Sequence, residues 1–376
     1  MGKHAKLSAS GAHRWMACPP SVKLEEGFPD SGSAYASEGT QAHELAEWWI
    51  PWKVKVLPTP IGKLRDYPAE MQDYIDIYTD WVAEFYLRIK HECEDAILLT
   101  EQRLDFSRWV PGGFGTGDVV IIADGTIHII DLKYGKGVPV SADHNPQLML
   151  YGLGAITAYD LVYEFDKVDL IIHQPRLDSI SVYSTTVDEL LEWGENVVRP
   201  AAEKALKGEG DQVPGDHCRF CKAAAVCRAR ASEAARLAAE EFDPETLTDD
   251  EIADMLGKLD RIIDYCGQLK EYTLAEALRG KKWSGYKVVE GKSRRKYGDE
   301  LAVAKKLKDA GYDEASFYEK KLLGITAMEK MLGKREFSEV LGGLVVKPAG
   351  APVLVPESDK RPEYPGADDF DEIKED

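Results

Sequence analysis

The chain has 376 residues, of which 44% are hydrophobic and 30% charged, and its formal net charge is −19. These values are typical of a soluble globular protein with more than one structural unit. The acidic balance argues against broad attraction to nucleic acid, so DNA binding would need a local basic groove or bound metal ions. The N-terminus lacks the apolar region of a signal peptide, and Lys6 breaks the myristoylation pattern. No apolar run approaches membrane-spanning length, so we expect a cytosolic protein with reduced cysteines and no membrane partner.

In chain order, the first predicted elements are helices at 36–50 and 68–91. Short runs rich in Ile and Val, bounded by Gly, Pro or Asp, then predict strands at 97–104, 117–124, 126–133, 168–175 and 179–187. The Asp124-Gly125 dipeptide favours a tight hairpin, because it accepts the positive φ angles of a two-residue turn. Helical patterns return at 144–159 and 187–207. The sequence therefore predicts the α/β class, with a mixed central sheet flanked by helices.

The character of the chain changes after Pro244. Residues 248–280 predict one long amphipathic helix or a broken pair, and shorter helices follow to about residue 342. From Pro348 the chain is rich in Pro, Gly and acidic residues. We expect a first domain at 1–240, a helical and basic region at 241–345, and an extended or disordered acidic tail at 346–376.

The stretch 115–137 carries the residues best suited to catalysis. Asp131 and Lys133 lie two apart on a predicted strand, so their side chains project from the same face. Asp118 lies on the preceding strand of the hairpin, and two carboxylates that converge at the end of a sheet suit Mg²⁺ or Mn²⁺. A nearby ammonium group would orient a water molecule or offset phosphate charge. The alternative is an ordinary surface ion pair, because a D-x-K motif alone is common.

Four further side chains extend this candidate site. Gln147 and Tyr151 lie four apart and share one face of the helix after the D-x-K strand, although Tyr151 would serve packing equally well. His43 lies in a predicted helix with two glutamates nearby, and a helical histidine is more often structural than a ligand. Glu101, on the strand before Asp118, would face either a metal ion or solvent.

Three of the six cysteines cluster as C-x2-C-x5-C, at Cys218, Cys221 and Cys227. In a reducing compartment such clustering indicates a metal site rather than disulfides. Structural zinc and iron–sulfur sites usually have four ligands, so this spacing alone leaves the fourth ligand and the metal open. Cys93 and Cys266 are most simply buried small side chains.

Taken together, the order of these features resembles the PD-(D/E)XK nuclease superfamily, and more narrowly its RecB-like exonuclease branch. The pattern comprises helical His43, a G-x2-D ending in Asp118, Asp131-x-Lys133, and Gln147-x3-Tyr151. It is similar to the CRISPR-associated RecB-like nucleases and to the nuclease domains of AddB-type helicase–nucleases. The resemblance covers about residues 5–235, and Gly117 stands where the superfamily name has proline.

This resemblance implies a restriction-endonuclease-like fold and a metal-dependent DNA nuclease, most simply an exonuclease. The Mg²⁺ or Mn²⁺ ligands that it implies are His43, Asp118, Asp131 and the backbone carbonyl of Leu132. It implies that Lys133 positions the attacking water, and that Gln147 and Tyr151 contact the DNA backbone or steady the site.

The resemblance also implies a 4Fe–4S cluster. In this branch a cysteine near the N-terminus, in an S-x-S…C-P context, joins three cysteines that follow the nuclease core. Ser8, Ser10 and Cys18-Pro19 match that context, which makes Cys18 the expected fourth ligand and His217 a less favoured substitute. The cluster would tie the N-terminal segment to the end of the nuclease core, and zinc is the competing metal.

The expected partner is DNA, either single-stranded or a duplex with an end. The whole chain resembles a phage-encoded protein that would act with recombination or replication proteins. The basic segment 279–296 interleaves Lys and Arg with Trp283 and Tyr286, which suits phosphate contacts and base stacking; a solvated hairpin is the alternative. The competing function is an inactive DNA-binding or recruiting protein with a structural zinc or iron–sulfur site, and the intact Asp118, Asp131 and Lys133 set argues against it.

Overall fold

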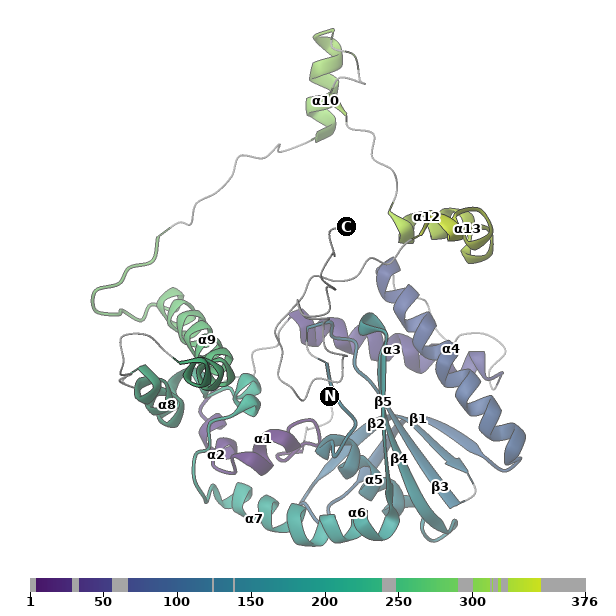
Figure 1. Cartoon of the computed structure of the whole chain (residues 1–376), viewed down its shortest axis with the longest axis vertical. Coiled ribbons are helices and arrows are strands. Elements are labelled where there is room, and N and C mark those ends of the chain that lie inside the picture. Colours follow the sequence, from purple (N-terminus) through teal and green to yellow (C-terminus); the bar gives the residue numbers. More distant parts are fainter. Residues whose placement is uncertain are drawn as a thin grey trace, which may run out of the picture. The chain divides into compact units, whose positions relative to one another are not determined.

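A computed structural model of the chain describes residues 5–28, 34–55, 67–123, 125–137, 139–238, 248–289, 300–311, 313, 317–318 and 324–345. The chain divides into two compact units, Met1–Lys281 and Lys282–Asp376. The first unit is built around a five-stranded sheet (Figure 1).

The sheet runs in chain order from β1 to β5. Its strands are β1 (Ile97–Asp105), β2 (Phe114–Ala123), β3 (Gly125–Leu132), β4 (Phe165–Gln174) and β5 (Ser179–Thr186). All neighbours are antiparallel except β3 and β4, which are parallel and joined through α5 (Pro146–Tyr159). The mixed sheet and the α/β class are therefore confirmed, and each strand begins and ends within three residues of its predicted bounds.

The hairpin between β2 and β3 has the predicted length. Ala123 pairs with Thr126, which leaves two residues for the turn. Gly125 has a φ of +65°, a conformation that glycine adopts without steric cost. Asp124 lies outside the described residues.

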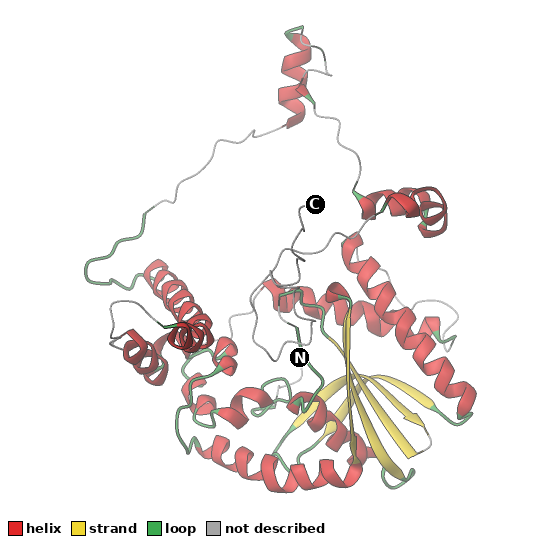
Figure 2. Cartoon of the chain, in the orientation of Figure 1, coloured by secondary structure: helices red, strands yellow, loops and turns green. Residues whose placement is uncertain are grey.

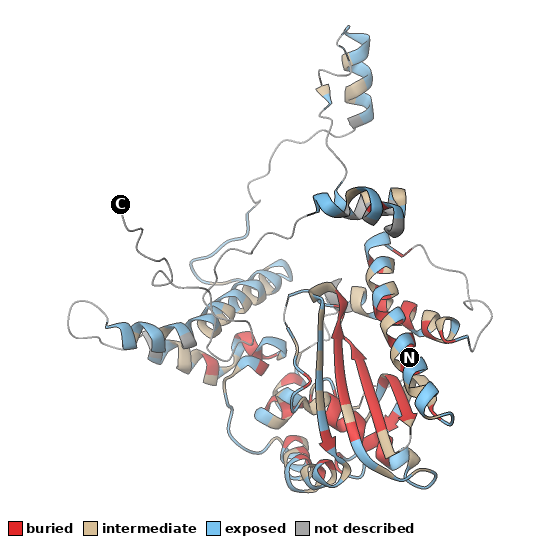
Figure 3. Cartoon of the chain, turned by 45° about the vertical axis from the view of Figure 1, so that its right-hand side comes forward, coloured by how far each residue is buried: buried red, intermediate tan, exposed pale blue. Residues whose placement is uncertain are grey.

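Helices cover both faces of the sheet (Figure 2). Alternation along β2 sends Val119 and Ile121 toward α3 (Ala34–Lys53) and α4 (Ala69–Glu92), and sends Val120 and Ile122 toward α5. The α5 face is completed by a continuous helical stretch of α6 (Val187–Trp193), the π-helical turn η2 (Gly194–Val198) and α7 (Arg199–Lys207). Figure 3 shows the resulting burial of the central strands, which lie between two apolar layers.

The cysteines Cys18, Cys218, Cys221 and Cys227 lie in or beside short helical elements. These elements are α1 (Ala12–Ala17), α2 (Ser21–Glu25), and the short 3₁₀ turns η3 (Asp216–Phe220) and η4 (Ala224–Val226). Then follow α8 (Arg228–Ala238) and α9 (Asp249–Leu278), of which α9 is one uninterrupted helix. α9 belongs to the first unit, since the buried Arg230 hydrogen-bonds Gln268 and pairs with Asp264. This grouping differs from the expected domain boundary at residue 240, which itself lies outside the described residues.

The second unit contains short helices, as predicted. They are α10 (Glu300–Asp309), α12 (Ile325–Leu332), α13 (Lys334–Leu341) and the 3₁₀ turn η5 (Gly342–Leu344). Within the basic segment, residues 282–289 are described and form no helix or strand, and Tyr286 is 84% exposed. The rest of that segment from residue 290, and the acidic tail 346–376, lie outside the described residues.

Candidate functional site

Asp118 is the centre of the candidate site. Its Oδ1 lies 3.0 Å from His43 Nδ1 on α3, and its Oδ2 accepts a 2.7 Å hydrogen bond from the backbone N–H of Leu132 on β3. The carboxylate therefore links α3 to the end of β3. Leu132 contributes its N–H to this link, and metal binding by its carbonyl stays a prediction.

Three carboxylates lie in line across β1, β2 and β3. Thr100 pairs with Val119 and Gln102 with Gly117, so Glu101 faces Asp118. The pairing of Val119 with Ile130 continues by one residue to bring Asp118 opposite Asp131. Like charges at facing strand positions repel one another, so a cation at this point of the sheet would stabilise it.

The backbone is strained where these strands meet. Glu101 has a φ of +47°, in the left-handed region that costs a non-glycine residue about 1–3 kcal/mol. The distortion is visible in the packing, since Leu99 and Leu104 both contact the α5-side core. Regular alternation would send side chains five residues apart to opposite faces. The break in alternation falls at Glu101, and such strain is typical of functional sites.

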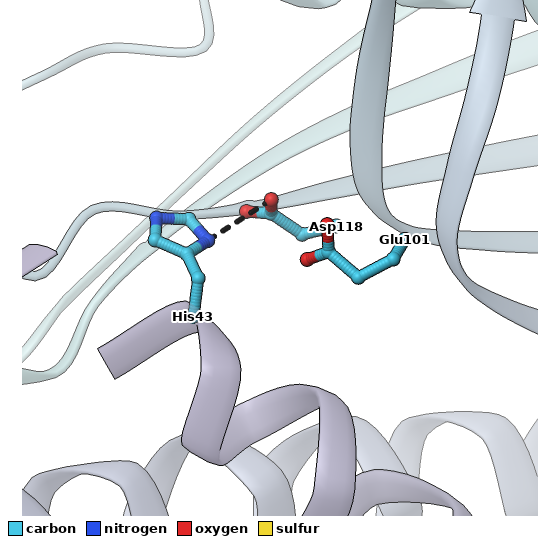
Figure 4. Close-up of side chains that lie close together, drawn as sticks. All are labelled: His43, Glu101 and Asp118. Carbon is cyan, nitrogen blue, oxygen red and sulfur yellow. Dashed lines mark ion pairs between the residues drawn. The ribbon is translucent and has the colours of Figure 1, made fainter. Parts of the chain in front are cut away.

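Figure 4 shows His43, Glu101 and Asp118 converging from α3, β1 and β2. One ligand atom from each of these residues lies within 4.8 Å of the other two. An imidazole with carboxylates is a donor set that accepts Mn²⁺ and other divalent ions, and carboxylates alone suit Mg²⁺. The predicted ligands His43 and Asp118 are thus brought together, and Glu101, which the sequence left between metal and solvent, joins them.

Asp131 is buried beside Asp118 and belongs to a second network. Lys133 Nζ lies 2.8 Å from Asp131 Oδ2 and donates a 2.9 Å hydrogen bond to Gln147 Oε1. Gln147 Nε2 in turn donates to Asp131 Oδ1 at 3.0 Å and to the Tyr151 hydroxyl at 3.3 Å. Four of the five predicted catalytic residues therefore lie in one continuous set of contacts, and the fifth, Asp118, lies opposite Asp131 on the neighbouring strand.

Local structure holds the α5 side of this network. The Asn145 side chain caps α5 by accepting from the N–H groups of Gln147 and Leu148, and Pro146 occupies the first turn. A Cβ at Gly115 would lie 2.6 Å from Tyr151 Cε1, so glycine is required for the close approach of β2 to the tyrosine ring. These features fix the positions of Gln147 and Tyr151 relative to the carboxylates.

The electrostatics are those of a crowded anionic site. Burial, followed by the charge of Asp118, raises the pKa of Glu101 from 4.5 to about 7. Burial opposes the charged form of His43, but the Asp118 carboxylate outweighs it and raises the His43 pKa to about 9. Burial also raises the pKa of Asp131, against the opposing effect of Lys133. Without a metal ion, a protonated His43 and Lys133 balance part of the negative charge.

The four cysteines of the second candidate site line one cavity. Cys18, after α1, lies with the three clustered cysteines around a space that Arg230 also lines. Burial, the largest effect, raises the pKa of the Cys221 thiol to about 12. His217 lines the same cavity, but its Nε2 is hydrogen-bonded to the Val213 carbonyl at 2.9 Å.

Direct contacts already join the two ends of this cysteine site. Glu25 on α2 is buried, pairs with Arg14 on α1, and accepts a 2.8 Å hydrogen bond from the backbone N–H of Lys222. Arg14 also donates to the Phe220 carbonyl. The N-terminal segment is therefore held against the region of η3 and η4 by hydrogen bonds between this ion pair and the backbone of Phe220 and Lys222.

The spacing of the thiols bears on the choice of metal. A tetrahedral zinc site with Zn–S bonds of about 2.3 Å needs its sulfurs about 3.8 Å apart. Among the described residues, the cysteine sulfurs form no group of three within 4.8 Å of one another. This spacing shows no preformed zinc site at the described cysteines, and the choice between zinc and a 4Fe–4S cluster stays a prediction.

Sequence reasoning missed Tyr78 on α4. Its side chain is fully buried, and its hydroxyl has no hydrogen-bond partner among the described residues. Burial, followed by the charges of Asp118, Asp131 and Glu101, raises the pKa of this hydroxyl well above its ordinary value. Tyr78 therefore interacts electrostatically with the carboxylates of the site. In the sequence Tyr78 occupies a core position of an amphipathic helix, and nothing there distinguishes it from packing.

Comparison with known proteins gives a family and a distant structural likeness. A solved structure titled "Crystal structure of SSO0001" is 14% identical, with a TM-score of 0.28, and the match covers 61% of this chain and 89% of that one. Within the part of the chain that the structure describes, no helix has the length and apolarity to cross a membrane. The family model described as "Protein of unknown function (DUF2800)" matches residues 4–362, so the chain belongs to the DUF2800 family.

Proposed function

We propose that this protein is a divalent-metal-dependent deoxyribonuclease of the PD-(D/E)XK type, with a restriction-endonuclease-like core and RecB-like exonuclease activity. The observation that carries the proposal is the convergence of Asp118, Asp131 and Lys133 at one point of the sheet. An ordinary surface ion pair would not be buried, yet Asp131 is 2% exposed. An ordinary surface ion pair would also not lie opposite a second carboxylate, as Asp131 lies opposite Asp118.

The residues fit a divalent cation. Asp131 Oδ2 is buried and lacks a well-directed hydrogen bond among the described residues, although Lys133 Nζ lies 2.8 Å away. The facing carboxylates of Glu101 and Asp118 repel one another, and His43 adds a nitrogen donor. His43, Glu101, Asp118 and Asp131 would hold Mg²⁺ or Mn²⁺, which lowers the pKa of water and offsets charge on a phosphate.

Lys133, Gln147 and Tyr151 would position the DNA phosphate and the attacking water. Asp131 keeps Lys133 charged by raising its pKa, although burial acts in the opposite direction. Gln147 fixes the ammonium of Lys133 through its amide oxygen, so that the charge is available to a scissile phosphate or to the attacking water. Burial also raises the pKa of Tyr151, which keeps its hydroxyl neutral and able to donate to the DNA backbone.

The four cysteines would hold a 4Fe–4S cluster with a structural role. Supporting this is the cavity that all four cysteines line. The cluster would add a long-range tie to the ion pair of Arg14 with Glu25. Phage recombination or replication is the process in which we place this activity.

The test is digestion of end-labelled linear DNA and of circular DNA with Mg²⁺ or Mn²⁺. We expect the linear substrate to be degraded and the circular one spared. Asp131→Asn should abolish cleavage while DNA binding persists. Asp105→Asn is the matched control. This β1 carboxylate is exposed and accepts a hydrogen bond from the backbone N–H of Ser107, which an asparagine side chain can also accept. Metal-independent binding without cleavage by the unaltered protein would favour the recruiting function instead.

A further inference from the structure

α9 carries an exposed apolar stripe on the side opposite its contacts with α8. From Ile252 to Cys266 its residues recur at alternating spacings of four and three, which is typical of helix pairing. Two leucines continue the stripe after a gap of eight residues. The stripe consists of Ile252, Leu256, Leu259, Ile263, Leu274, Leu278 and Cys266, which is exposed rather than buried as expected. The six aliphatic side chains are 40–70% exposed, and Ile263 and Leu278 are the most exposed at 60% and 70%.

The other side of α9 explains why this stripe stays uncovered. Arg261 pairs with Glu233 on α8, and Gln268 with Asp264 holds the buried Arg230. These contacts fix the helix on the first unit by its polar side. Figure 3 colours the helix mostly as exposed or intermediate. A stripe of this length on a 30-residue helix exceeds the scattered apolar residues of an ordinary surface.

We propose that α9 pairs antiparallel with α9 of a second copy of this chain, about a two-fold axis that crosses the stripe at the level of Tyr265 along the helix. The two ends of the stripe are symmetric about this residue, whereas Leu259 falls opposite Glu271. Ile252 and Leu278 lie equally far on either side of Tyr265, as do Leu256 and Leu274. An isologous contact therefore brings apolar residues against apolar residues at both ends.

The centre of the pairing also fits. Ile263 of one copy meets Gly267 of the other, and a Cβ built at Gly267 finds nothing within 4 Å, so the glycine leaves room for the branched side chain.

The charges along α9 favour the same arrangement. Asp260 and Lys270 lie equally far from Tyr265, so each faces the other across the pair, and both are exposed with no ion pair to a described residue. The acidic first turn, Asp249 and Asp250, comes against the end of the partner helix, where Arg279 lies. Opposed helix dipoles add a favourable contribution. A parallel pair would instead bring acidic ends together.

The first test is the molar mass of the full chain by light scattering at micromolar concentration. We expect about 84 kDa, twice the 41.8 kDa of one chain. The double variant Leu256→Asp with Leu274→Asp should be monomeric. Leu161→Asp is the control, since Leu161 is 94% exposed and lies off the stripe, and it should remain dimeric. A monomeric unaltered chain, or a dimer that survives the two aspartates, overturns the proposal.

A charge exchange tests the orientation without altering the apolar stripe. Asp260→Lys alone and Lys270→Asp alone should each weaken the dimer about tenfold, because each places like charges at two symmetry-related contacts. The double variant should regain the original dissociation constant. Single variants that leave it unchanged, or a double variant weaker than either, would exclude the antiparallel alignment about Tyr265.

Discussion

Replacing Glu101 with glutamine should stabilise the metal-free protein and weaken its response to Mn²⁺. The carboxylate is partly buried opposite Asp118, and these surroundings raise its pKa from 4.5 to about 7. Each pH unit between these values is worth about 1.4 kcal/mol, which gives about 3 kcal/mol at most. Since the side chain is partly exposed, solvent screening reduces this to about 1–2 kcal/mol.

The difference in unfolding free energy between the unaltered protein and Glu101→Gln depends on pH. Below pH 4.5 the carboxyl is protonated in both the folded and unfolded chains, and Glu101 carries no penalty. As the pH rises from 4.5 to about 7, the unfolded chain ionises first, so the stability of the unaltered protein falls relative to the variant. The difference between the two proteins should therefore grow across this window and stay constant above it.

Urea unfolding in the presence of a chelator, at pH 5.5 and pH 8, measures this difference. Adding Mn²⁺ should then stabilise the unaltered protein more than Glu101→Gln, since a bound ligand stabilises in proportion to its affinity. Glu101→Gly should gain up to about 1 kcal/mol more than glutamine, because it also relieves the left-handed φ of +47°. Equal stabilities of glutamine variant and unaltered protein at pH 8, with equal Mn²⁺ responses, would refute this account of the carboxylate cluster.

Three further predictions concern other parts of the molecule. Gly115→Ala should lower turnover on saturating DNA by displacing the Tyr151 ring, whereas Gly27→Ala, whose Cβ meets nothing within 4 Å, should not. Burial lowers the pKa of His173 to about 4, so unfolding free energy should fall as the pH drops from about 6.5 to about 4, and His173→Leu should flatten that fall in urea titrations. Neutralising the basic residues 294–296 together should weaken DNA binding and flatten its salt dependence, with turnover at saturation changed less.

Local periodicity accounts for the features that the sequence predicted correctly. The alternation of Val119 to Ile122 between two cores is a local property of β2, so both the strand and its two-sided burial were predictable. The same holds for Gln147 and Tyr151, whose spacing of four places them on one helical face, where they are hydrogen-bonded. The proximity of Asp131 and Lys133 likewise follows from strand geometry.

Properties that depend on strand register or on contacts between distant segments could not be predicted from the sequence. Glu101 faces Asp118 only because β1 pairs with β2 in one particular register, and a shift of one residue would send it to the other face. Its left-handed backbone breaks the alternation from which strands are predicted. The attachment of α9 to α8 depends on long side chains such as Arg230 and Arg261, whose partners lie in another helix. Neither feature leaves a periodic signal.

The last prediction joins the cysteine site to the catalytic one. α1 buries Trp15 in the same core as α5, the helix that carries Gln147 and Tyr151. A cluster that binds Cys18 together with three cysteines about 200 residues away closes a long loop, worth on the order of 5 kcal/mol at most. Cys18→Ser should therefore lower both the visible absorption of anaerobically purified protein and its melting temperature.

Cleavage by Cys18→Ser should be reduced rather than abolished, because the serine loosens the support of α5 without removing a residue that contacts DNA. Cys93→Ser is the control, since Cys93 does not line the cavity with the other four cysteines and should keep full absorption. A Cys18→Ser protein with unaltered absorption and melting temperature would show that the fourth ligand lies elsewhere. Stoichiometric zinc without iron would show that the site holds zinc instead of the cluster. The long-range closure would still stand, because either metal needs the thiol of Cys18.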